Sequence, residues 1–216
     1  MKFPQENAGY PLVVKFARYT ARKLRTSGRT EMANDIASMA LGLRAKGRIW
    51  EDAEDAVQDA LADRDSADDA LDAMAQEGRN TLAGRSVSAA REEPYTLIYP
   101  DGIGYYIAAP QDAEVARYRE LMLRIESHLP DGDVVRAQTS EGVTTGLAAF
   151  SAGVAALDET ETTKLLARTE LERANRNLRR QLEKTYGVLV AELGRMRAER
   201  FFPKAAKNKK GEGSEG

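Results

Sequence analysis

The sequence predicts a mainly α-helical protein: an antiparallel helical bundle with long, coiled-coil-like helices and one short β-hairpin inserted at about 95–108. Three observations lead to this prediction. Apolar residues recur at alternating spacings of three and four along most of the chain, which is the period of an amphipathic helix. Proline and glycine interrupt that period at a few places. Between Pro94 and Pro110, β-branched and aromatic residues replace it.

The composition is that of a charge-rich helical protein without cysteine. Of the 216 residues, 42% are hydrophobic and 31% are charged, and the net charge is −2. That balance does not indicate a globally basic nucleic-acid binder. The absence of cysteine excludes thiolate metal sites and cysteine nucleophiles. Because we find no secretory signal and no apolar run of about 18 residues, we expect a cytoplasmic protein.

One helical bundle domain is expected, over 11–202. Residues 1–10 precede the first helical pattern and are expected to be flexible. The last segment, 203–216, combines lysines with glycines and holds no core-forming residue beyond alanine. It is therefore expected to be a disordered basic tail.

Proline and glycine are expected to delimit the first two helices. Pro11 can occupy a first helical turn, and Gly28 is expected to end the first helix. In the second helix, apolar residues at spacings of four, three and four run from Met32 to Leu43. Gly47 is expected to end this second helix.

The longest regular pattern comes next. From Trp50 to Met74, spacings of three and four alternate over more than three heptads, which favours a left-handed, coiled-coil-like seam. Many of the positions along this seam are alanine, so the helices that meet there are expected to approach closely. Gly78 and Gly84 are expected to kink or interrupt this helix before Pro94 ends it.

The predicted hairpin consists of two runs of β-branched and aromatic residues on either side of a Pro-Asp-Gly turn signal at 100–102. It holds four of the eight tyrosines. Outward-facing tyrosines would make contact surface, and packing of the same rings against the bundle is an equal alternative. These candidate interface residues are Tyr95, Tyr99, Tyr105 and Tyr106.

An uncharged segment, Gly146–Leu157, follows after a helical pattern from Val115 to Leu129. Such a segment is small or apolar on every side of a helix, so we expect a buried central helix. Twelve residues span only about 18 Å, against roughly 30 Å for the hydrocarbon core of a bilayer. Membrane insertion is therefore the less favoured alternative.

The last helix is expected to begin near Asp158, where Asp158 and Glu161 resemble a capping box, and to continue to about Arg200. At about 60 Å it would exceed a compact body of this size. Its distal stripe is expected to lie uncovered if glycines break the neighbouring 49–92 segment, and an exposed apolar stripe marks an interface. The candidate interface residues on this stripe are Tyr186, Leu189, Leu193 and Met196.

Charge is distributed unevenly along the chain. Residues 1–50 hold ten Lys or Arg against three acids, net +7, and residues 51–77 hold one against eleven, net −10. Packing of the first helix beside the third, within the chain or between subunits, would neutralise both segments. A second basic group, opposed only by Glu199, is a candidate contact for nucleic acid or an anionic membrane, with a solubilising tail as the favoured alternative. It comprises Arg195, Arg197, Arg200, Lys204, Lys207, Lys209 and Lys210.

No sequence pattern indicates catalysis. The single histidine, His128, cannot supply the Glu-x-x-His pairs of a di-iron bundle or a zinc ligand set. No Gly-x-Ser-x-Gly elbow accompanies it, so a hydrolase triad is not indicated either. We predict no catalytic residue, no metal, no cofactor and no small-molecule substrate.

The predicted function is that of a non-enzymatic structural or interaction protein, which acts through self-association or through one dedicated protein partner. Three alternatives stand beside it. The first is a membrane-active, pore-forming-like bundle that uses 146–157, and the second is a nucleic-acid-associated protein that uses the basic C-terminal end. The third is an enzyme that relies on carboxylates and tyrosines alone.

Overall fold

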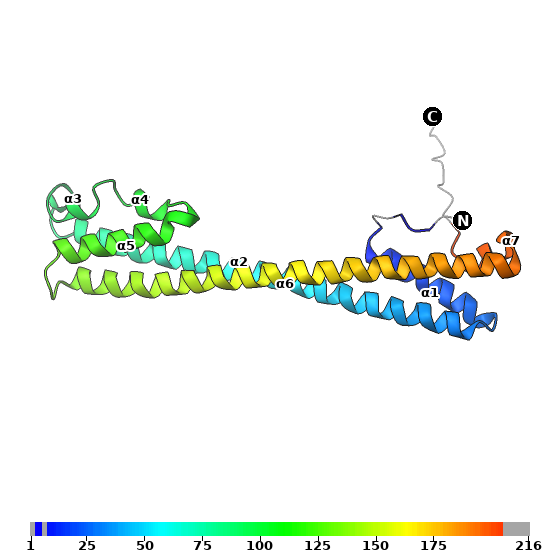
Figure 1. Ribbon diagram of the computed structural model, residues 1–216. Coiled ribbons are helices and arrows are strands. Elements are labelled where there is room, and N and C mark those ends of the chain that lie inside the picture. Colours follow the sequence, from blue (N-terminus) through cyan, green and yellow to red (C-terminus); the bar gives the residue numbers. More distant parts are fainter. Residues whose placement is uncertain (1–2, 6–7, 205–216) are drawn as a thin grey trace, which may run out of the picture. The chain divides into compact units, whose positions relative to one another are not determined.

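The computed structural model describes residues 3–5 and 8–204 (Figure 1). These residues are mainly helical, with no strand among them, so the helical part of the predicted mainly α class is confirmed. Single 3-10 turns lie at Ala89–Arg91 and Glu199–Phe201. The α-helices are α1 (Tyr10–Thr26), α2 (Thr30–Ala83), α3 (Tyr95–Ile98), α4 (Gly104–Ile107), α5 (Gln111–His128), α6 (Val134–Leu193) and α7 (Arg195–Ala198).

The chain divides into two compact units, whereas the sequence pattern indicated one bundle domain. Unit 1 comprises residues 1–54 and 163–216, and unit 2 comprises residues 55–162. The two longest helices, α2 and α6, each contribute residues to both units.

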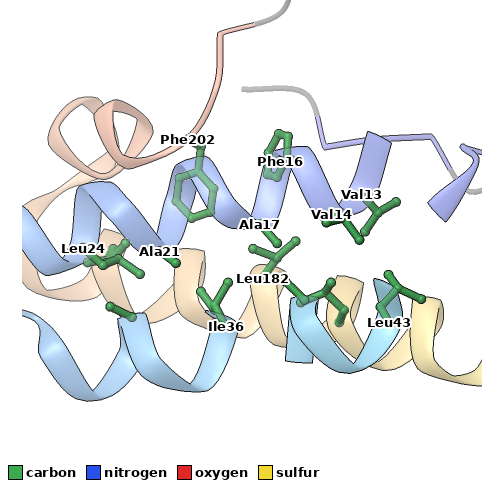
Figure 2. Packing of buried hydrophobic residues seen from close by; sticks show 14 of the residues in the cluster. Val13, Val14, Phe16, Ala17, Ala21, Leu24, Ile36, Leu43, Leu182 and Phe202 are labelled. Atoms are coloured by element: carbon green, nitrogen blue, oxygen red, sulfur yellow. The ribbon is translucent and has the colours of Figure 1, made fainter. Parts of the chain in front are cut away.

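Unit 1 contains a core formed by α1, the first part of α2 and the last part of α6. Val13, Ala17 and Leu24 of α1 are fully buried against residues such as Ile36 of α2 and Leu182 of α6 (Figure 2). These positions repeat at the three-and-four spacing of one helix face. An aromatic cluster adjoins this core, with ring centroids 5.5 to 6.1 Å apart. The cluster consists of Phe3, Phe16, Tyr186 and Phe202.

Gly28 ends α1 as predicted, but Gly47 does not end the second helix. Gly28 has a φ of +80°, and the backbone N–H of Arg29 donates to the carbonyl oxygen of Leu24. Gly47 instead lies inside α2, where a Cβ atom would lie 2.3 Å from the ring of Tyr10. This glycine makes room for an aromatic ring, so the predicted helix end at Gly47 is wrong.

The predicted start of a helix near Asp158 is also wrong, because α6 runs unbroken from Val134 to Leu193. No proline lies within this range, so the Asp158 pattern sits on the surface of a continuous helix. The helix ends at Gly194, whose φ of +75° favours glycine.

The predicted β-hairpin at 95–108 is wrong. The two runs form the short helices α3 and α4, which pack on α5 (Figure 1). Tyr95, Tyr99 and Tyr106 are buried in the core of unit 2, with ring centroids 5.4 and 5.9 Å apart along the series. The Tyr106 hydroxyl donates to the carbonyl oxygen of Ile98 at 2.9 Å. Burial of these rings in one core outweighs the local β preference of the segment.

Glycines allow α2 and α6 to approach closely within unit 2. A Cβ atom at Gly78 would lie 2.2 Å from Oγ1 of Thr139, and one at Gly146 would lie 2.8 Å from Cδ1 of Leu71. The predicted close approach at Gly146–Leu157 is therefore present. The expectation that this segment is buried on every side is wrong, because one face of the helix is open to solvent. Its exposed residues include Ala148, Ala149, Ser151, Ala152, Ala155 and Ala156.

Candidate interaction surface

A groove lies between α1 and the first part of α2 in unit 1. It has a volume of about 590 Å³ and adjoins a second hollow of about 350 Å³. The two share Val14, Arg18 and Arg44 in their walls, so together they make one continuous surface feature, called here the basic groove. The cations that line the basic groove are Lys15, Arg18, Arg22 and Arg25 of α1, and Arg44 and Arg48 of α2.

Helix periodicity gathers these cations on one side of the groove-forming pair. On α1 they follow spacings of three, four and three, which places them on one face. The adjoining face of α1 carries Val13, Ala17 and Leu24 and is buried in the core. On α2, Arg44 and Arg48 lie four residues apart and therefore one turn apart.

None of these cations forms an ion pair with an acid in the part of the chain that the structure describes. Among the described residues, no ion pair involves Lys15, Arg18, Arg22, Arg44 or Arg48. Arg25 donates to the amide oxygen of Asn34 at 2.9 Å. The acid in the wall, Glu51, accepts the hydroxyl of Tyr10, and this hydrogen bond raises the pKa of Tyr10. The basic groove therefore carries a concentrated positive charge that no ion pair among the described residues neutralises.

The basic groove also has apolar walls. Its lining includes the buried side chains Val14, Ala21 and Ala40. Two larger side chains stand at its surface: Leu41 is 73% exposed and Tyr19 is 42% exposed. A ligand that fills this groove therefore meets cations and apolar surface together.

Among the described residues of segment 1–50, the ion pairs go to α6. Arg29 pairs with Glu192 at 2.7 Å, and Lys46 pairs with Glu170 at 2.9 Å. The predicted neutralisation by the acidic segment 51–77 is not among the ion pairs of the described residues. The sequence did not indicate α6 as the partner, because its acids lie more than a hundred residues away along the chain.

Unit 2 carries a row of exposed acids on α2, called here the acidic stripe: Asp55, Asp59 and Asp63. They lie at successive spacings of four, on one side of the helix. None of the three belongs to an ion pair between the residues that the structure places. The nearby Asp65 differs, since it pairs with Arg64.

A buried carboxyl group lies elsewhere in unit 2. Glu114 of α5 is 5% exposed, beside Asp68 and Asp72 of α2. Burial, followed by the hydrogen bond and the charge of Asp68, raises the pKa of Glu114 to about 8. The hydroxyl of Tyr118 donates to Asp72. The sequence contained a signal for this burial, because Glu114, Tyr118, Leu121 and Ile125 follow spacings of four, three and four.

The distal stripe of α6 is covered rather than exposed. Leu189 is fully buried, and Tyr186 and Leu193 are partly buried against the core of unit 1. The neighbour predicted to cover it was the 49–92 segment, but α1, the beginning of α2 and Phe202 form this core instead. Only Met196, which belongs to α7, is widely exposed, at 83%. These residues are therefore not brought together as one surface.

The basic C-terminal end is only partly described. Arg195, Arg197, Arg200 and Lys204 are exposed. Arg195 pairs with Glu199 at 3.2 Å, so part of this charge is neutralised. Lys207, Lys209 and Lys210, together with the predicted disordered tail beyond residue 204, lie outside the described residues.

Most of the tyrosines in segment 95–108 are buried in the core of unit 2. Tyr105 alone is partly exposed: its hydroxyl donates to Glu120 at 2.9 Å, and the Arg117 guanidinium lies 4.4 Å from its ring centroid. Burial raises the pKa of Tyr106 to about 12. Their predicted role as outward contact surface does not fit this placement for Tyr95, Tyr99 and Tyr106.

Within residues 3–5 and 8–204, no group of three or more His, Asp or Glu side chains is arranged to hold a metal ion. No helix in this part of the chain combines the length and apolarity needed to cross a membrane. No protein-family model, curated protein or solved structure gives a significant match to this chain.

Proposed function

We propose that this protein is an interaction protein that binds the acidic surface of another protein chain in the basic groove, and that it acts by binding rather than by catalysis. One observation carries the proposal. The basic groove holds six cations above apolar walls, and none of the six forms an ion pair with an acid among the described residues.

The apolar part of the groove favours a protein ligand over a nucleic acid. A phosphate backbone is bound chiefly through its charge. An amphipathic helix with acidic flanks satisfies the cations and also covers Leu41 and Tyr19, which are otherwise exposed to water. Each exposed ion pair contributes only about 0–1 kcal/mol, whereas covering apolar surface contributes about 25 cal/mol per Å². We therefore expect binding that salt weakens without abolishing it.

The test compares two labelled probes on the full chain: a helical peptide with aspartates at spacings of four beside one leucine stripe, and a single-stranded DNA. Fluorescence anisotropy is expected to show tighter binding of the peptide. Arg18→Glu combined with Arg22→Glu is expected to remove that binding. Both side chains are exposed on α1, so the fold should survive, and circular dichroism checks this.

The matched control is Arg197→Glu combined with Arg200→Glu, which makes the same charge change at the basic C-terminal end. It is expected to leave peptide binding unchanged. If this control pair loses binding while the groove pair retains it, the binding site is the C-terminal end. Tighter binding of the DNA probe would favour a nucleic-acid partner and overturn the proposal.

A further inference from the structure

We infer that the occupant of the basic groove is a second copy of this chain, which presents the acidic stripe of its α2. This inference rests on the proposed function and names the partner of the same site. The contact joins two different surfaces, the groove of one copy and Asp55, Asp59 and Asp63 of the next.

The spacings of the two charged rows are compatible. On α1, Lys15 and Arg25 are ten residues apart, which is about 15 Å along a helix. Asp55 and Asp63 are eight residues apart, or about 12 Å. Both rows follow one side of a regular helix, so three acids meet several cations at once without a change in either backbone.

The charges of both surfaces are available. The cations of the basic groove and the acids of the acidic stripe are exposed. Neither set takes part in ion pairs between described residues. Ala62 lies three residues after Asp59, beside the acidic stripe, and its side chain is exposed and small.

A contact between two different surfaces has a recognisable consequence. Each copy that uses its groove still offers its stripe, and each copy that uses its stripe still offers its groove. Two copies can satisfy both contacts reciprocally about a two-fold axis; otherwise the contacts continue into chains of copies or close into a larger ring. The average mass should therefore rise with concentration, and salt should lower it because the contact is charged.

The experiment uses sedimentation velocity on the full chain and on two variants. The first has a disabled groove, Arg18→Glu with Arg22→Glu. The second has a disabled stripe, Asp55→Asn with Asp59→Asn and Asp63→Asn. Each variant alone is expected to be monomeric. Mixed in equal amounts, they are expected to form a complex of two copies that grows no further, because only one groove and one stripe remain intact.

Three results would overturn the inference: a wild-type chain that stays monomeric at high concentration, variants that associate as the wild type does, or a mixture that contains monomers alone. The control Arg197→Glu with Arg200→Glu should associate as the wild type does. If the wild type is monomeric but still binds the acidic peptide, the inference of a second copy is wrong and the proposed function is retained. A wild type that is monomeric and also fails to bind the peptide would contradict both the inference and the proposed function.

Discussion

Gly78 of α2 faces Thr139 of α6 so closely that a Cβ atom on the glycine would lie 2.2 Å from the threonine Oγ1. Thr139 is buried, at 3% exposure, so it has little space to move away. This pair fixes how near the two helices come within unit 2.

Gly78→Ala is therefore expected to destabilise the protein by about 1–3 kcal/mol, the usual cost of overpacking, although alanine has the better helix propensity. The matched control is Gly187→Ala, in α6, where nothing lies within 4 Å of the new Cβ atom. It should stabilise by about 0.5–1 kcal/mol. Urea unfolding measures both, and a stabilising Gly78→Ala would contradict the packing described.

The buried Glu114 predicts a dependence of stability on pH. Its pKa is about 8 in the folded protein against 4.5 for the free side chain, so the folded state holds this proton more tightly than the unfolded state does. The stabilisation is full below about pH 4.5 and is lost as the pH rises through 8. The groups around it are Asp68, Asp72, Arg64 and Tyr118.

Glu114→Gln removes this ionisation and should flatten the fall in stability between pH 4.5 and pH 8. At the alkaline end the variant is expected to be more stable than the wild type by about 2 kcal/mol, because no charge is buried. Glu126→Gln, on the exposed surface of α5, is the control and should keep the wild-type profile. Parallel profiles for wild type and Glu114→Gln would show that burial does not govern this carboxyl.

Phe202 is expected to be a main contributor to the stability of unit 1. It is 1% exposed and lies against the rings of Phe3, Phe16 and Tyr186. Phe202→Ala should cost about 3–5 kcal/mol. Met196→Ala, six residues earlier and largely exposed, should change stability by less than about 0.5 kcal/mol. Thermal unfolding measures the stability of both variants. Equal, small effects would mean that Phe202 is not packed in the core of unit 1.

Tyr106 joins α4 to α3 through its hydroxyl, which donates to the carbonyl oxygen of Ile98. Tyr106→Phe keeps the ring and leaves that carbonyl oxygen without this donor, so a loss of about 1–2 kcal/mol is expected. Tyr19→Phe removes a hydroxyl from an exposed ring and serves as the control. Equal stability of both variants would mean that the hydroxyl bond contributes nothing.

Local periodicity accounts for what could be predicted of the fold. Long helices carry many repeats of the three-and-four spacing, so their existence was evident. A four-residue helix such as Tyr95–Ile98 carries about one turn, too little for any period to register. Tyr95 in this helix and Tyr99 directly after it have a β preference, and the core into which their rings pack decides between strand and helix.

Contacts between distant residues account for what could not be predicted. Gly47 has the same local appearance as a helix stop, and only the ring of Tyr10 reveals that it serves close packing. The positive charge of residues 1–50 was visible in the sequence. Its gathering into a groove depends on how α1 and α2 lie against each other, and no local pattern encodes that.

The division into units has a consequence for the order of folding. Unit 2 is one continuous stretch, 55–162, whereas unit 1 is built from the first 54 residues and from residues after 162. On a ribosome, which delivers the N-terminal part first, α1 emerges early but cannot complete its core until Leu178, Leu182 and Phe202 have been synthesised. Unit 2 can therefore fold while the apolar face of α1 still waits for its partners, and a nascent chain stopped before residue 163 should expose that face to chaperones.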